Sequence, residues 1–152
     1  MNVSFVNPFI TATINTFKTM MNVDIHPGAP KLKSVPNPTY DISGIIGLSG
    51  TAQGSIAMSF PKIMALRVVS KMLGTEIKII GPDISDAIGE IVNIVAGNAK
   101  QDLTEYALSI SLPNVIMGAG HSLMSQSGVP TIIVPFNCDM GEFAMEISLK
   151  TD

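Results

Sequence analysis

Residues 84–106 carry the apolar pattern that most constrains how this chain can fold. At about 100° per residue, its apolar side chains repeat on one side of a helix. They are Ile84, Ile88, Ile91, Val95, Ala99 and Tyr106. Asp83 or Ser85 can cap the start, and Asp86 lies in the first turn, where the helix dipole favours a negative charge. The pattern therefore predicts one long amphipathic helix, ending at about Tyr106, that packs on a core through one face.

The segments around this helix predict the rest of the fold class. Apolar residues at helical spacing predict a helix within 4–22, and "PKIMALRVVSKMLG" predicts a second from Pro61 to a stop at Gly74. Strands are predicted for a hairpin at about 42–49 and 54–60, and for 114–120, 129–137 and 141–150. A proline-rich connection occupies 23–39. We predict an α+β fold, with two long helices packed on a mixed, largely antiparallel sheet.

The length of 152 residues fits one domain spanning 1–152. The pattern of "FITATINTF" is echoed by "AIGEIVNIV", which predicts a weak internal repeat that aligns Asn15 with Asn93 and Ala12 with Glu90. The first half then lacks the acid, so one candidate site per chain follows. Hydrophobic residues make up 46% and charged residues 14%. This balance indicates a large core or a surface covered by another subunit.

Charge and composition exclude several classes of function. A net charge of −3 and nine scattered Lys and Arg argue against a nucleic-acid partner, which would require a basic stripe. No apolar run is long enough for a membrane span, and the first residues lack the features of a signal peptide, so we expect a cytoplasmic protein. Cys138 is the single cysteine, and His26 and His121 lie far apart, so we expect no bound metal or cofactor.

The polar side of the helix over 84–106 is unusual because it combines a carboxylate and an amide with glycines. The outer stripe contains Asp86, Glu90, Asn93, Gly97 and Thr104, and Gly89 and Lys100 border it. Each glycine costs a helix about 1 kcal/mol relative to alanine. Without side chains at Gly89 and Gly97, a partner's backbone could approach the Glu90–Asn93 pair, with Ile94 and Ala96 supplying apolar contact. The alternative is a solvated helix face with no role.

Glu90 and Asn93 offer limited chemistry by themselves. A carboxylate and an amide without a nucleophile, histidine or metal do not make a self-contained hydrolase. An amide can hold and orient a water, and positioning the attacking water is a central task in phosphoryl transfer.

With this spacing, the chain resembles the CheC/CheX/FliY family of chemotaxis phosphatases. The family pattern of an acid or Ser, three residues, Glu, two residues and Asn is matched by Asp86, Glu90 and Asn93. The surrounding "DISDAIGEIVNIVAGNAKQDL", the hairpin "GTAQGSIAMSFP" and the helix "KIMALRVVSKMLG" look like the CheX branch. The family also has a proline some twenty residues or more after the Asn, and Pro113 comes slightly earlier than that.

The resemblance implies a CheC-like fold and a function. It implies a protein phosphatase that dephosphorylates a phosphorylated CheY-like response regulator in chemotaxis. Asn93 would orient the water that attacks the aspartyl phosphate, and Glu90 would anchor the partner through a receiver lysine. Asp86, Gly89, Ile94 and Gly97 would belong to the docking face. Mg²⁺ and the phosphoaspartate would belong to the receiver, and single-site relatives of this kind form homodimers.

Two other functions remain open at this point. One is a non-catalytic docking or scaffold module of a signalling or flagellar-switch assembly, since similar sheets can serve assembly and a fold does not fix a function. The other is a sensory domain that binds a ligand under the "MGAGHS" loop, although the sequence shows no cluster of polar groups there.

Overall fold

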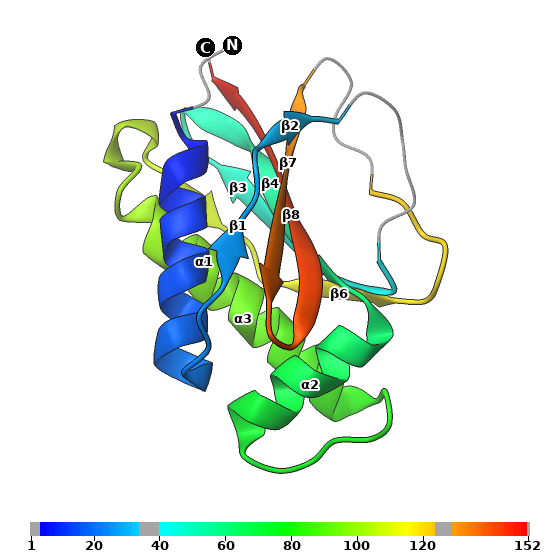
Figure 1. Ribbon diagram of the computed structural model, residues 1–152. Helices are drawn as coiled ribbons and strands as arrows, with labels where there is room; N and C mark the ends of the chain where they lie inside the picture. Colours follow the sequence, from blue (N-terminus) through cyan, green and yellow to red (C-terminus); the bar gives the residue numbers. More distant parts are fainter. Residues whose placement is uncertain (1–3, 34–39, 124–128, 152) are drawn as a thin grey trace.

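The computed structural model describes residues 4–33, 40–123 and 129–151, and they form three helices and one sheet (Figure 1). The helices are α1 (Val6–Met21), α2 (Lys62–Leu73) and α3 (Pro82–Lys100), with a 3₁₀ turn at Thr104–Tyr106. The strands are β1 (His26–Pro27), β2 (Lys31–Leu32), β3 (Ile42–Ser49), β4 (Ala52–Phe60), β5 (Ser109–Ile110), β6 (Asn114–Met117), β7 (Thr131–Cys138) and β8 (Gly141–Thr151).

The sheet is antiparallel at every strand pair among the described residues. Its order is β1-β7-β8-β4-β3-β5, with β2 also on β7 and β6 also on β3. β1, β2 and β5 are two-residue strands, too short for a period-2 pattern to predict from sequence. The predicted α+β class is confirmed, and the sheet is antiparallel rather than mixed.

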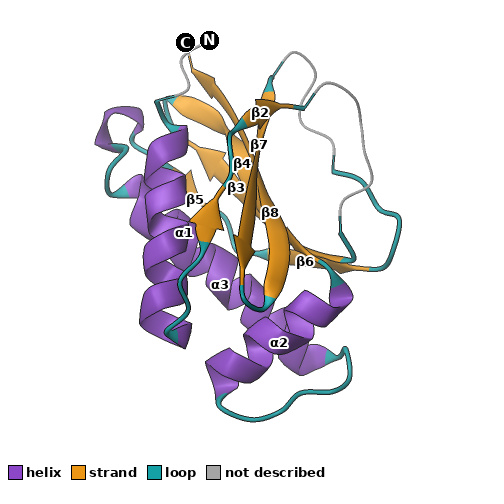
Figure 2. Ribbon diagram, in the orientation of Figure 1, coloured by secondary structure: helices purple, strands orange, loops and turns teal. Residues whose placement is uncertain are grey.

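The helices form one layer against one face of the sheet (Figure 2). α1 and α3 pack side by side, α3 lies over β3 and β4, and α2 contacts α3 and β8. The predicted helices in 4–22 and 61–74 are confirmed, and Gly74 is the left-handed C-cap of α2, with φ of 70°.

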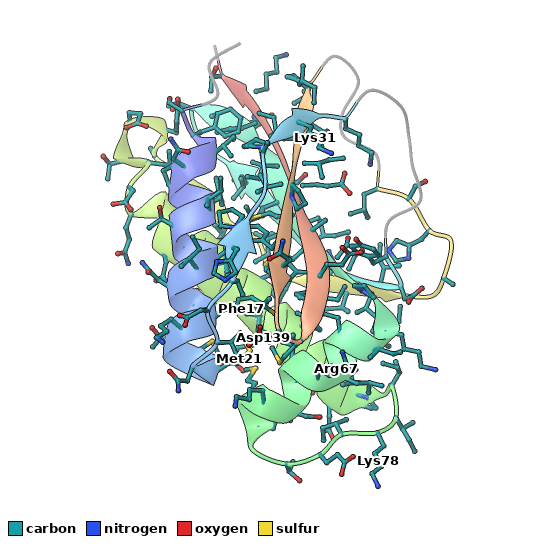
Figure 3. The ribbon with its side chains drawn as sticks, in the orientation of Figure 1. Phe17, Met21, Lys31, Arg67, Lys78 and Asp139 are labelled. Carbon is teal, nitrogen blue, oxygen red and sulfur yellow. The ribbon has the colours of Figure 1, made fainter. Side chains whose placement is uncertain are left out.

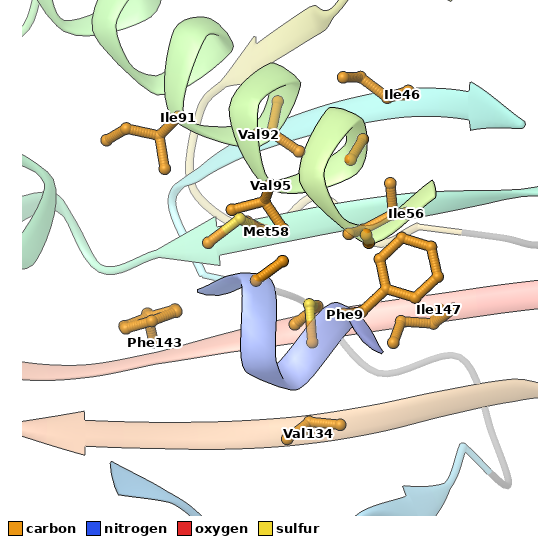
Figure 4. Packing of buried hydrophobic residues seen from close by; sticks show 14 of the residues in the cluster. Phe9, Ile46, Ile56, Met58, Ile91, Val92, Val95, Val134, Phe143 and Ile147 are labelled. Atoms are coloured by element: carbon orange, nitrogen blue, oxygen red, sulfur yellow. The ribbon is translucent and has the colours of Figure 1, made fainter. Parts of the chain in front are cut away.

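The core fills the space between the helices and the sheet (Figure 4). Alternate residues of β8 face the helices and are buried, as the period-2 pattern predicted: Phe143, Met145, Ile147 and Leu149. The ring of Phe143 stacks on Phe17 of α1 and Phe136 of β7 at centroid distances of 4.9 Å. These aromatic contacts, each worth about 0.5–1.5 kcal/mol beyond area burial, tie α1 to the middle of the sheet.

α3 begins and ends differently from the prediction. Neither Asp83 nor Ser85 caps it, because Gly81 is the N-cap and Pro82 takes the first helical position, where the missing N–H is not needed. The helix ends at Lys100 rather than at Tyr106. Leu103 is buried and its N–H bonds back to the carbonyl of Lys100, which tightens the chain into a turn. Thr104 and Tyr106 therefore do not extend the faces of α3.

Candidate functional site

Glu90 and Asn93 lie together on the solvent side of α3. The opposite side of the helix is held in place by Ile84, Ile88, Ile91, Val92 and Val95, all fully buried. This buried face fixes the rotation of α3 about its axis, and both Glu90 and Asn93 are exposed. Side chains three apart on a helix are neighbours, with about 5–6 Å between Cβ atoms. Both side chains of the predicted pair therefore lie on the same exposed side of α3.

Neither side chain is engaged by the described part of the chain. No hydrogen bond or ion pair links Glu90 or Asn93 to another described residue. Asp86 is likewise exposed one turn before Glu90. A carboxylate and an amide held on a rigid helix, yet free of internal partners, can offer their full hydrogen-bonding capacity to another molecule.

The two glycines of the predicted docking face have different surroundings. At Gly97, an added Cβ would have no described heavy atom within 4 Å, so this part of the helix is open to a partner. At Gly89, an added Cβ would lie 3.5 Å from both Pro113 Cγ and Val115 Cγ2. Gly89 is buried under the chain's own segment leading into β6. The expectation that a partner approaches at Gly89 is therefore wrong, because Pro113 and Val115 of the same chain already cover that side.

The apolar flank of the stripe is also narrower than predicted. Ile94 is half-buried and can contribute apolar surface, whereas Ala96 is fully buried and cannot. The exposed surface available to a partner thus runs along Asp86, Glu90, Asn93 and Gly97, with Ile94 on one side.

The sheet face opposite the helices carries a polar cluster that sequence reasoning missed. Ser43 Oγ lies 2.7 Å from Ser59 Oγ and 2.7 Å from Nε2 of His121, whose Nδ1 lies 2.6 Å from the carbonyl oxygen of Gly118. Residues 114–120 had been predicted as strand, but β6 stops at Met117 and the chain turns there to bring His121 back to the sheet. Only the alternation of small polar residues in the strands could have indicated this cluster.

This cluster fastens the 118–121 loop to the sheet and does not make a ligand site. Ser43 is fully buried. The neighbouring cavity, lined in part by Glu146, Ser148 and Thr131, measures about 80 Å³. Ligand pockets usually measure about 300–1,000 Å³. The sensory alternative therefore gains polar groups from the structure, but the cavity that the described residues line here is smaller than a metabolite pocket.

No group of three or more His, Cys, Asp or Glu within the described ranges could hold a metal ion. Among these residues, the exposed Glu90 and Asn93 have no such group beside them. The helices described here include none that is long and apolar enough to cross a membrane.

Residues 42–137, more than half of the chain, match the family model for the chemotaxis phosphatase CheX. The chain belongs to the CheX family. The matched range contains the whole of α2 and α3, and with them Glu90 and Asn93.

Individual CheX relatives match along their full length. The CheY-P phosphatase CheX of Thermotoga maritima is 26% identical over 153 residues, covering 99% of both chains. The crystal structure of a chemotaxis protein CheX from Desulfovibrio desulfuricans is 37% identical, with a TM-score of 0.89 over 97% of this chain and 100% of that one. The CheX in the CheX–CheY–BeF₃–Mg²⁺ complex from Borrelia burgdorferi is 28% identical, with a TM-score of 0.84 over 98% and 99%. The predicted CheC-like fold is thereby confirmed.

Proposed function

We propose that this protein dephosphorylates a phosphorylated CheY-like receiver, with Asn93 orienting the attacking water and Glu90 anchoring the receiver. The observation that carries the proposal is the exposed Glu90–Asn93 pair, free of partners within the described chain, on the helix shared with the CheX family. The relatives named as a CheY-P phosphatase and as a CheX–CheY complex support the substrate.

The reaction is hydrolysis of the receiver's aspartyl phosphate. Water attacks phosphorus, the bond from phosphorus to the carboxyl oxygen breaks, and aspartate and inorganic phosphate result. The Asn93 amide has both a carbonyl acceptor and N–H donors, so it can hold a water in one orientation. Pre-orienting the water removes several kcal/mol of entropic cost from the barrier when the geometry is near attack. Mg²⁺ would be held by the receiver, as the Borrelia complex suggests.

The test is the decay of a phosphorylated CheY-like receiver with and without the protein. Asn93→Ala should lose the acceleration even at saturating concentration, because the water is no longer held. Glu90→Ala should mainly raise KM, because the anchor is removed while the amide remains. Asn98→Ala is a matched control, since Asn98 is also an exposed asparagine on α3 but lies outside the stripe. If the native protein leaves every receiver's lifetime unchanged, a scaffold function replaces the phosphatase.

We also propose that two copies associate through β6. This strand lies at the edge of the sheet, where it pairs with β3. Apolar side chains are exposed at the end of β6 and just before it: Ile116 and Met117 in the strand are 39% and 46% exposed, and Leu112 ahead of it is 85% exposed. An unpaired strand edge bearing apolar groups is a template for another strand. We expect a homodimer in sedimentation analysis that Ile116→Lys/Met117→Lys converts to a monomer, while Ile79→Lys, at an exposed position outside the sheet, leaves it intact. A double variant that stays dimeric would place the interface elsewhere.

The single domain and its internal repeat are part of the same proposal. α1 and α3 pack together, Asn15 is exposed on α1 as Asn93 is on α3, but Ala12 is buried where α3 has Glu90. The half-site on α1 lacks the anchor, so we expect one active site per chain. We place the protein in the cytoplasm with its receiver.

A further inference from the structure

α2 and the loop that follows it border an open groove of about 700 Å³. Its apolar lining comes from Ile63, Leu66, Ile77 and Met140, and its cationic lining from Arg67, Lys71 and Lys78. Figure 3 shows Arg67 on α2 and Lys78 on the loop beneath it. Ile63 is 61% exposed, which is high for a large aliphatic side chain in an ordered helix. The groove is distinct from the exposed stripe, because its lining contains no residue of α3.

The walls of this groove are fixed by hydrogen bonds. Ser70 Oγ accepts the backbone N–H of Ile77 at 2.8 Å, which fastens the loop to α2. Arg67 Nη1 donates to the carbonyl oxygen of Met140 at 2.8 Å, which fastens the β7–β8 turn to the same helix. A groove held open in this way loses little conformational entropy when it binds, so pre-formed geometry favours affinity.

The charge around the groove is opposite to that of the whole protein. The groove's lining carries Arg67, Lys71 and Lys78 against one acidic residue, Glu76, giving +2 in a chain of net charge −3. Three of the cations that look scattered along the sequence thus line one groove in the structure. Lys78 lies 4.0 Å from Glu76 in a highly exposed pair, which contributes little.

Arg67 and Lys71 place two like charges next to each other on α2 without a carboxylate partner among the described residues. They stand one helical turn apart, and neither forms an ion pair with a carboxylate of the described residues. Like charges at this spacing destabilise a helix by a few tenths of a kcal/mol. A carboxylate between them would relieve the repulsion, while apolar side chains of the same ligand could cover Ile63 and Leu66.

We propose that this groove binds an acidic segment of a partner protein, with carboxylates against Arg67 and Lys71 and apolar side chains against Ile63 and Leu66. The mixture of apolar and cationic side chains in the lining suits an amphipathic acidic segment, and vesicles are included in the test to distinguish such a segment from an anionic membrane. Such a partner could hold the protein in an assembly without covering Glu90 and Asn93.

The test uses the full chain and a synthetic helical peptide of about 15 residues, with leucines on one face and glutamates on the other. A control peptide carries lysines in place of the glutamates. Binding is measured by fluorescence anisotropy at about 0.05 M and 0.3 M NaCl, because exposed charge pairs weaken as the Debye length shrinks. We expect saturable binding of the glutamate peptide alone, weaker at the higher salt.

Charge reversal locates the binding. Lys71→Glu should weaken binding several-fold and Arg67→Glu/Lys71→Glu by about tenfold or more. Lys71→Glu is included because Lys71 bonds to no described residue, so its substitution leaves the turn contact of Arg67 intact. Lys31→Glu/Lys150→Glu is the matched control, because both lysines are exposed, and Figure 3 shows Lys31 at the opposite end of the molecule from Arg67. Circular dichroism confirms folding.

Four outcomes of the binding experiments would overturn the proposal. They are no binding of the glutamate peptide, equal binding of the lysine peptide, indifference to both charge reversals, or binding of phosphatidylserine vesicles in place of the peptide. Receiver dephosphorylation is measured on the same variants. If Arg67→Glu/Lys71→Glu raises KM for the phosphorylated receiver, the groove binds the receiver itself, and the proposal of a separate acidic partner is refuted. If the native protein does not accelerate receiver dephosphorylation, the proposed phosphatase function is refuted. The peptide experiment still decides whether the groove binds an acidic segment.

Discussion

Substituting alanine for Gly89 and for Gly97 of α3 tests whether a glycine serves packing within the fold or leaves space for a partner. Gly89 and Gly97 both looked like points where a partner's backbone approaches, but only Gly97 is open to solvent. We expect Gly89→Ala to stabilise the protein and leave its activity unchanged. Gly97→Ala should also stabilise the protein, but it should raise KM for the phosphorylated receiver, because the new methyl group stands in the path of the docking surface.

The magnitudes follow from the surroundings of each position. Alanine is favoured over glycine by about 1 kcal/mol in a helix interior. At Gly89 the new Cβ would meet Pro113 and Val115 at 3.5 Å, ordinary van der Waals contact, so the full gain should appear. Gly97 lies in the last turns of α3, so about 0.5 kcal/mol is expected there. For a domain of this size, 1 kcal/mol corresponds to about 2–4 °C in Tm.

The assay pairs urea unfolding with receiver dephosphorylation on the same preparations. The free energy of unfolding should rise in both variants at constant m-value. KM should rise several-fold in Gly97→Ala, with kcat preserved because Asn93 is untouched. Gly89→Ala is the matched control for any general effect of a stiffer helix.

Two results would refute this reasoning. If Gly97→Ala is stabilised but keeps the native KM, no partner approaches the helix there. If Gly89→Ala loses stability, the fit of Pro113 and Val115 over that glycine is tighter than the distances show.

The remaining predictions concern the sheet and its second face. Gly54→Ala should cost about 3 kcal/mol in urea unfolding, because its Cβ would collide with a backbone carbonyl oxygen of β8. Lys33 Nζ lies 2.7 Å from Oε1 of Glu146, and both side chains are under 10% exposed. Lys33→Met should therefore lower the free energy of unfolding by about 3 kcal/mol or more, because it leaves the Glu146 carboxylate buried without its partner. Lys33→Met/Glu146→Leu should recover most of that loss. Burial, then a hydrogen bond to Glu142 and its charge, raise the pKa of Tyr40 above 10.0. The folded state therefore favours the protonated phenol of Tyr40. Its contribution to the free energy of unfolding is full below about pH 10 and is lost as pH rises through the raised pKa. Above that pH, the free energy of unfolding should fall less steeply with pH in Tyr40→Phe than in the native protein.

The sequence predicted the long helices and strands because their apolar pattern repeats often enough to be recognised. The twelve residues of α2 and the eleven of β8 each repeat their pattern of apolar side chains several times. It missed β1, β2 and β5, since two residues cannot show a period. It also extended α3 to Tyr106, because Tyr106 fits the helical period although the chain had already turned at Leu103.

The candidate site was predictable only in part. The helical period alone placed Glu90 and Asn93 on the outer side of α3, because the buried residues of the helix fix which side faces the core. The resemblance supplied their roles. The burial of Gly89 could not be predicted, since it depends on a segment more than twenty residues away.

The sequence by itself determined the elements and the outward face of α3, because hydrophobic period is a local property of the chain. Tertiary structure alone decided which parts of that face stay open and which positive charges gather in one place. Pro113 covers Gly89, and the loop fastened by Ser70 brings Lys78 to the groove with Arg67. Contacts between distant segments depend on how the whole chain packs, and no periodic pattern in one segment records them.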